Sequence, residues 1–274
     1  MPEGPEIRRA ADEIAAVLEG STVDTVKFGV PRLRRYSAQL RGHQVINIET
    51  RGKALLTHFE HGYSIYSHNQ LYGVWRVIRG HKLPKSSRSM RLLLQTSTHS
   101  AILYSASDIS VWPTAELMAH PFLAKIGPDI MDRSLTWRDI AQRLREPDFV
   151  RKELAALYLD QKFLAGNGNY LRSEILHDAR LHPRARPGEL SRGDIGRLAR
   201  STLTLSRRSY ETGGITFAAH GENAQTLVGP DDEWRITEAA LISPDNRQLA
   251  RLPGHIAYWF AWQNFRPDAE TRIE

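Results

Sequence analysis

The sequence predicts an α+β fold in which an N-terminal helix and a two-layer β-sandwich precede a helical domain and a final β-hairpin. Short stretches of alternating apolar and polar residues fill the first part of the chain, as is typical of a sandwich. From about residue 114 the apolar residues recur at helical spacing, which indicates a separate helical domain. The length of 274 residues is sufficient for two domains that each bury a core.

The first predicted element is a helix close to the N-terminus. Pro5 suits its first turn, and Gly20 occupies the position of a C-terminal cap. Its apolar residues at helical spacing are Ile7, Ala10, Ala11, Ile14, Val17 and Leu18.

The other elements follow in order along the chain. Alternation predicts strands at residues 23–28, 45–50, 54–59, 63–67, 73–78, 90–95 and 101–104. Helical spacing predicts helices at residues 136–145, 151–164, 169–179 and 191–209. Two strand-like runs, 234–242 and 249–262, are joined by the turn residues Ser243-Pro244-Asp245-Asn246 and predict a hairpin.

Composition restricts the classes of function. Lys and Arg number 37 against 31 Asp and Glu, and the pI near 9.6 favours a polyanionic partner. Cysteine is absent, so disulfides, thiolate zinc sites and thiol catalysis are excluded. The eleven histidines show no metal-ligand spacing, so no metal is expected. With no signal segment and no apolar run of about 20 residues, a cytoplasmic protein is expected.

The N-terminal residues have the chemistry of an amine nucleophile. Once Met1 is removed, Pro2 presents a free secondary amine that can attack an electron-poor carbon and form an iminium ion. Glu3 and Glu6 place carboxylates beside it, and the positive end of the helix dipole disfavours the ammonium form. A purely structural interpretation also fits, because carboxylates stabilise any helix N-terminus.

A second candidate is Lys53 in the turn Arg51-Gly52-Lys53, between two predicted strands. In a cleft beside an amine, this lysine could donate a proton or hold a phosphate. A lysine on a hairpin is more commonly a solvated charge, and that interpretation stays open.

The polar loop Ser67-His68-Asn69-Gln70-Leu71-Tyr72-Gly73 also lies between two predicted strands. If exposed, Leu71 and Tyr72 could fill a void in a base stack while Gln70 bonds to an orphaned base edge. The alternative is a hairpin whose Leu and Tyr pack on the core.

The segment Gly166-Asn167-Gly168-Asn169-Tyr170 joins two predicted helices. Its glycines permit tight turns, and a helix beginning near Asn169 would offer backbone N–H groups to a phosphate. An ordinary helix–helix turn with an Asn cap explains the same residues.

These four motifs together resemble the formamidopyrimidine-DNA glycosylase and endonuclease VIII family, specifically its endonuclease VIII branch, from Pro2 to about Thr216. Each motif is weak alone, but their order and the terminal position of the first make the resemblance specific. It implies a β-sandwich catalytic domain (1–125), a helix-two-turn-helix DNA-binding domain (126–216), and a hairpin and tail (217–274).

The resemblance also implies roles for single residues. Pro2 corresponds to the Schiff-base nucleophile at the sugar C1′, Glu3 to the proton donor, and Lys53 to the β-elimination donor and phosphate ligand. Supporting acids correspond to Glu6 and Glu174. The family residues that fill the gap left by the everted nucleotide correspond to Gln70, Leu71 and Tyr72. The family residues that contact phosphates correspond to Lys125, Asn169 and Tyr170.

The sequence departs from the family at its C-terminal finger. Members commonly carry a four-cysteine zinc finger, whereas residues 234–262 resemble its zincless variant. The position of the finger arginine holds His255, with Arg251 as the alternative, which leaves its part in δ-elimination open. Asn167 also replaces the apolar residue usual in the loop.

The resemblance therefore implies a bifunctional DNA glycosylase and AP lyase of base excision repair. It is expected to remove oxidised bases, mainly pyrimidines, and to cut the strand by β-elimination, with δ-elimination left open. It is also expected to be a monomer that needs no cofactor and binds damaged DNA, nucleoid-associated if bacterial. Two rivals remain: a non-catalytic lesion-binding protein, and a glycosylase specialised for single-stranded, bubble or crosslinked DNA.

Overall fold

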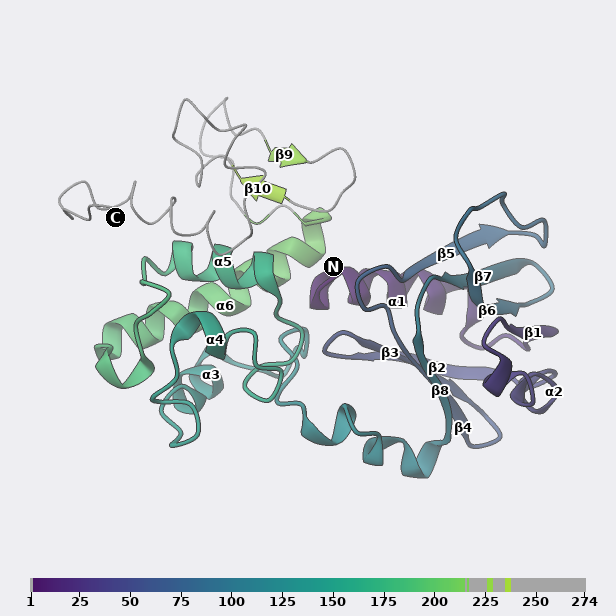
Figure 1. The fold of residues 1–274 in the computed structure, drawn as a ribbon, viewed down its shortest axis with the longest axis horizontal. Coiled ribbons are helices and arrows are strands. Elements are labelled where there is room, and N and C mark those ends of the chain that lie inside the picture. Colours follow the sequence, from purple (N-terminus) through teal and green to yellow (C-terminus); the bar gives the residue numbers. More distant parts are fainter. Residues whose placement is uncertain (1, 215, 217–225, 229–234, 238–274) are drawn as a thin grey trace. The chain divides into compact units, whose positions relative to one another are not determined.

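The computed structural model describes residues 2–214, 216, 226–228 and 235–237. The chain divides into two compact units, residues 1–126 and 127–274 (Figure 1).

The first unit contains two antiparallel four-stranded sheets, which confirms the predicted sandwich (Figure 1). One sheet has the order β1-β6-β7-β5 and the other β2-β3-β4-β8. The strands are β1 Thr25–Phe28, β2 Val45–Arg51, β3 Ala54–Phe59, β4 Tyr63–His68, β5 Val74–Arg79, β6 Met90–Gln95, β7 His99–Tyr104 and β8 Asp108–Pro113.

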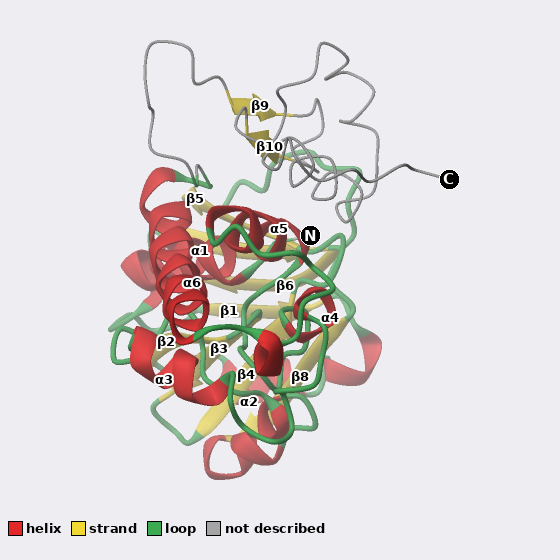
Figure 2. Cartoon of the chain, turned by 90° about the vertical axis from the view of Figure 1, so that its left-hand side faces the viewer, coloured by secondary structure: helices red, strands yellow, loops and turns green. Residues whose placement is uncertain are grey.

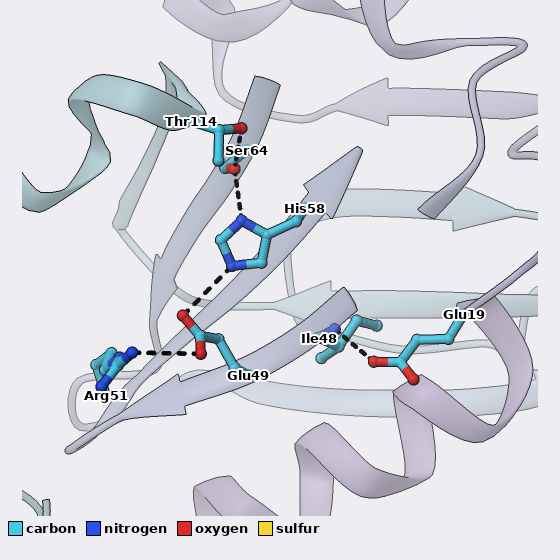
Figure 3. Close-up of polar contacts among 7 residues, drawn as sticks. All are labelled: Glu19, Ile48, Glu49, Arg51, His58, Ser64 and Thr114. Carbon is cyan, nitrogen blue, oxygen red and sulfur yellow. Dashed lines mark hydrogen bonds and ion pairs between the residues drawn. The ribbon is translucent and has the colours of Figure 1, made fainter. Parts of the chain in front are cut away.

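Helix α1, Gly4–Leu18, completes the core of the sandwich. Its buried face, which includes Ile7 and Ile14, packs in one apolar cluster with residues of both sheets. The predicted helix is confirmed, and Gly20 follows its end with φ +74°. Glu19 Oε1 accepts a 2.5 Å hydrogen bond from Ile48 N, which ties the end of α1 to β2 (Figure 3).

Strand β8 was not predicted, although it completes the second sheet by pairing with β4. Its residues alternate over a short stretch that ends in Pro113, and its partner lies some 45 residues earlier, as in the pair Ser64↔Trp112. Local periodicity carries no signal of such a pairing.

Short helices complete the first unit: η1 Pro31–Leu33, α2 Tyr36–Leu40, η2 Thr114–Ala119 and η3 Leu123–Lys125. The last two cover the outer face of the β2-β3-β4-β8 sheet, where Leu117 and Leu123 pack against Leu56 and Tyr66. Both faces of β3 are consequently buried.

The second unit is helical (Figure 2). Its long α6 packs against α3 and α5 over a separate apolar core. The side chains of Thr136 and Ser191 cap α3 and α6 by accepting hydrogen bonds from Asp139 N and Asp194 N. Its helices are α3 Trp137–Arg143, α4 Leu154–Leu157, α5 Asn169–Asp178, η4 Pro187–Glu189 and α6 Arg192–Thr212.

The predicted helix at 151–164 is wrong, because only Leu154–Leu157 is helical there. Two backbone N–H groups near its start donate to residues outside the segment. Leu154 N donates to Ala185 O and Ala155 N donates to Pro183 O, both at 2.9 Å. The rest forms turns around Asp160, whose carboxylate accepts from Lys162 N and Lys152 Nζ. Apolar spacing alone does not distinguish such buried turns from a helix.

Strands β9 Thr226–Val228 and β10 Arg235–Thr237 pair antiparallel. The second lies in the first strand of the predicted hairpin, and β9 was not predicted. The rest of that hairpin, with His255 and Arg251, lies outside the described residues.

Candidate active site

The N-terminal residues precede the first turn of α1. Glu3 is the N-cap residue, with extended backbone angles, and its side chain is buried. The Glu6 carboxylate accepts a 2.9 Å hydrogen bond from Glu3 N and lies 3.4 Å from Arg9 Nη2. Partly buried Pro2 stands directly before this capped turn. The amine position and two carboxylates are thereby fixed at one helix end.

Lys53 lies in the tight turn between β2 and β3, which Gly52 permits with φ +61°. Only 7% of Lys53 is exposed, so the interpretation as a solvated hairpin charge is wrong. Burial lowers the pKa of Lys53, while the negative charges of Glu3 and Glu6 act to raise it. The charges of these three groups therefore interact, with Glu3 and Lys53 buried and Glu6 half-buried.

A network of polar side chains, which we call the polar network, supports this turn from the adjacent strands (Figure 3). Arg51 Nη2 lies 3.5 Å from Glu49 Oε2, and Glu49 Oε1 lies 3.5 Å from His58 Nε2. His58 Nδ1 is 2.8 Å from Ser64 Oγ, which is 2.7 Å from Thr114 Oγ1. The contact with the His58 ring lowers the pKa of Glu49. The polar network thus joins the Lys53 turn to the start of η2.

The order Glu49, His58, Ser64 matches the acid, base and nucleophile of a hydrolase triad. Ser64, however, is fully buried and hydrogen-bonded to Thr114. No substrate carbon can reach the Oγ atom of Ser64, so the polar network serves to hold β2, β3 and β4 together. Sequence reasoning missed it because the contacts join residues on different strands.

The loop after β4 does not form a hairpin but crosses from one sheet to the other, since β4 and β5 belong to different sheets. Leu71 is 57% exposed and Tyr72 is 65% exposed, so neither packs in the core. Large apolar side chains held in solvent indicate a binding surface. We call Gln70, Leu71 and Tyr72 the wedge.

Four hydrogen bonds hold the wedge. Gln70, with φ +54°, donates its N–H to His68 Nδ1 at 3.0 Å, and its side-chain oxygen accepts from Ser107 Oγ. Arg88 Nη1 donates to Tyr72 O at 2.8 Å, and Gly73 N donates to Asn69 O at 2.8 Å. A Cβ at residue 73 would lie 2.4 Å from Asn69 O, so only glycine fits there. The wedge is therefore pre-shaped.

His68 links the wedge to the Lys53 cluster, and sequence reasoning did not single it out. Burial lowers its pKa, the charge of Asp108 acts to raise it, and that of Lys53 acts to lower it further. His68 is paired with Ala54, the residue that follows Lys53, so it lies next to the Lys53 turn. Lys125, by contrast, is exposed at the end of η3.

The second unit contains the other candidate residues on and around α5. Asn169 is exposed at the first position of this helix, and Gly168 is its N-cap. Tyr170 Oη lies 2.8 Å from Ser209 Oγ, and buried Glu174 accepts a 3.1 Å hydrogen bond from Thr216 Oγ1. The prediction that a helix begins at Asn169 is confirmed.

A glutamine that the sequence analysis overlooked shapes the preceding loop. Gln161 Oε1 accepts from Gly166 N, and Gln161 Nε2 donates to Asn167 O, both at 3.0 Å. The side chain of Asn167 is fully buried, and neither of its polar atoms has a hydrogen-bond partner among the residues that the structure describes. This substitution therefore places an unsatisfied amide under the loop.

In the part of the chain that the structure describes, no three His, Cys, Asp or Glu side chains are grouped so as to hold a metal ion. No helix among the same residues is long and apolar enough to span a membrane.

Comparisons with known proteins show what the chain resembles in sequence. Residues 1–107 match the family model of the formamidopyrimidine-DNA glycosylase N-terminal domain. An "Endonuclease 8" of Pectobacterium atrosepticum is 50% identical over 214 residues, covering 78% of this chain and 81% of the relative. One of Salmonella arizonae is 48% identical over 225 residues, covering 82% and 86%.

Solved structures share the fold. A complex of Lactococcus lactis Fpg with DNA that contains an abasic site superposes with a TM-score of 0.67 at 20% identity, covering 80% of this chain and 82% of that one. A complex of the same protein with DNA containing N7-benzyl-Fapy-dG gives 0.68 at 18% identity, covering 86% and 97%.

Proposed function

The chain belongs to the formamidopyrimidine-DNA glycosylase and endonuclease VIII family, in its endonuclease VIII branch, and from that premise we propose how its residues perform the chemistry. It is a DNA glycosylase with AP lyase activity in base excision repair, and it binds damaged DNA. The observation that carries our assignment of residues is the buried cluster of Glu3, Glu6 and Lys53 behind Pro2.

Pro2 is the nucleophile, with its nitrogen as the free N-terminus. The amine lone pair forms a bond to C1′ of the damaged nucleotide, and the C1′–N bond to the base breaks, so the base leaves with the bonding electrons and takes up a proton. The Pro2 nitrogen gives up its own proton, Glu3 donates a proton to the sugar ring oxygen as the C1′–O4′ bond breaks, and the nitrogen lone pair then forms a double bond to C1′. The product is an iminium ion between Pro2 and C1′.

The iminium acidifies the C2′ proton. Its loss places a double bond between C2′ and C3′ and expels the 3′ phosphate, which cuts the strand by β-elimination. Lys53 serves in this step as a proton donor and as a phosphate ligand. Its burial supports that role, since a lysine with a lowered pKa exchanges protons more readily near neutral pH.

The wedge occupies the space that the damaged nucleotide leaves when it turns out of the helix. Leu71 and Tyr72 supply stacking surface, and Gln70 hydrogen-bonds the base that has lost its partner. Their exposure and the four hydrogen bonds behind them support this assignment.

Phosphate contacts come from exposed groups of both units, Lys125 at the end of η3 and Asn169 at the N-terminus of α5, with Tyr170 beside it. Two acids support the site: Glu6, which is half-buried, and Glu174, which is buried. His255 takes the place of the finger arginine. A loss of δ-elimination in Arg251→Ala but not in His255→Ala would assign that place to Arg251 instead.

We further propose that oxidised pyrimidines are the main substrates and that the protein acts as a monomer in the cytoplasm, at the nucleoid. The sandwich of residues 1–125, the helix-two-turn-helix domain of 126–216 and the zincless finger of 217–274 divide the catalytic and DNA-binding tasks. The finger needs no zinc, because the chain has no cysteine.

Borohydride trapping on a panel of oligonucleotides tests this function. Thymine glycol, dihydrouracil, 8-oxoguanine and an abasic site are placed in duplex, bubble and single-stranded DNA. We expect covalent complexes with all abasic substrates and fastest trapping on the oxidised pyrimidines in duplex. Faster trapping on single strands or bubbles would favour a specialised enzyme, and binding without trapping would identify a non-catalytic lesion-binding protein.

A further inference from the structure

Residues 61–107 contain no Asp or Glu, although the whole chain has 31. The same segment contains six cations, Arg76, Arg79, Lys82, Lys85, Arg88 and Arg91. Net positive charge is therefore concentrated in this part of the first unit, because no acidic residue within the segment offsets its cations.

The connection from β5 to β6, residues 80–89, crosses the full length of its sheet. Both strands pair antiparallel with β7, so they run parallel and the chain must return from one end of the sheet to the other. At one end Gly80 N bonds to Thr98 O at 2.6 Å. At the other Ser105 N bonds to Ser89 O at 2.9 Å. We call residues 79–89 the basic strap.

The cations of the basic strap are exposed and uncompensated. Arg79, Lys82, Lys85 and Arg88 all lie on the surface. Within the described residues, none of them takes part in an ion pair. Like charges that repel one another without local anions form a surface suited to a polyanion.

The spacing of these cations fits a nucleic-acid backbone. Lys82, Lys85 and Arg88 are three residues apart in a segment without helix or strand, so each step spans up to about 10 Å. Three nucleotides of one DNA strand rise by about the same 10 Å.

One end of the basic strap contacts the wedge. Arg88 Nη1 donates the 2.8 Å hydrogen bond to the carbonyl oxygen of Tyr72. A guanidinium carries five N–H donors in a fixed fork, so Arg88 can hold this carbonyl and a phosphate oxygen together.

We propose that the basic strap binds the phosphate backbone of DNA beside the lesion, and that Arg88 couples this contact to the position of the wedge. Lys82 and Lys85 contribute affinity, and Arg88 is a positioning residue that acts through Tyr72. This proposal rests on the proposed function, in which the wedge fills the site of the everted nucleotide.

Salt-dependent binding of the full-length chain tests the affinity part. Lys82→Gln with Lys85→Gln removes two strap charges, and Lys27→Gln with Arg41→Gln removes the same charge from exposed positions outside the basic strap. Each lost phosphate contact lowers the slope of log K against log salt by about 0.9, so the strap pair should lower it by about 1.8 on undamaged duplex. An unchanged slope, or an equal fall in the control pair, would overturn the proposal.

The positioning part is tested with 2-aminopurine beside the lesion, whose fluorescence reports unstacking when the wedge enters. Arg88→Gln should reduce the rate of this signal and lower kcat at saturating DNA, whereas the Lys82 and Lys85 pair should raise KM and leave kcat unchanged. Equal kcat in Arg88→Gln and wild type would remove the coupling. Wild-type binding without trapping would instead refute the proposed function, and trapping with an unchanged slope would refute only the strap.

Discussion

The backbone N–H of Glu3 donates a hydrogen bond to Glu6 Oε2 at 2.9 Å, which fixes the chain directly behind Pro2. Glu6→Ala removes this cap and should cost about 1 kcal/mol of stability. Glu6→Gln keeps an acceptor oxygen and should lose less. Urea unfolding measures both, and borohydride trapping should slow more in the alanine variant. Equal stability and equal trapping in the two variants would show that the cap does not position the amine.

Glu3→Gln should abolish base excision but retain part of the lyase activity on a pre-formed abasic site. The acid is needed most when the base must leave, whereas an abasic sugar already opens its ring. Gel assays of both substrates under single-turnover conditions measure the difference. Equal losses on the two substrates would contradict the assignment of Glu3 as the sugar acid.

Lys53→Met should stabilise the protein while it abolishes strand cleavage. Because the pKa of Lys53 is lowered in the fold, the unfolded chain binds more protons between the lowered pKa and the ordinary value, so wild-type stability rises with pH across that window. Methionine carries no charge to bury. Its advantage in urea unfolding should be largest below the lowered pKa of Lys53 and should shrink as the pH rises through that pKa. A variant less stable than wild type at pH 7 would contradict the burial cost.

Asn167→Leu should raise the unfolding free energy, because it removes a buried amide whose two polar atoms lack partners within the described part of the chain. Such groups cost about 1 to 3 kcal/mol. Asn167→Asp, of similar size, would bury a charge and should lower stability, so it serves as the matched control. Thermal melts of the three proteins measure the order, and a leucine variant that melts below wild type would show that the amide has a partner.

Local patterns were sufficient for most of the fold. Helix α1 and the turn at Gly52 were predicted because spacing and turn residues act within a few positions. The start of α5 at Asn169 followed from the same kind of signal. Strand β8 was missed and the helix at 151–164 was wrong, since their hydrogen bonds join distant segments, such as Leu154 with Ala185.

The candidate site shows the same limit. The sequence identified Lys53 as a candidate but not its burial, which depends on the sandwich around it. It identified the wedge, yet His68, Ser107 and Arg88, which hold the wedge, come from separate strands and loops. The sequence was sufficient to identify side chains that act directly on DNA. Side chains that act by holding another residue could be identified only from the structure.

Pro2 as the nucleophile is the central assignment, and peptide mass spectrometry after borohydride reduction tests it directly. The mature protein is incubated with an abasic oligonucleotide, reduced and digested, and the cross-linked peptide is sequenced. We predict a single adduct on the nitrogen of Pro2, none when Met1 is retained, and residual adduct with Pro2→Gly, which is still an amine. An adduct on Lys53, or full trapping with a blocked N-terminus, would contradict the account.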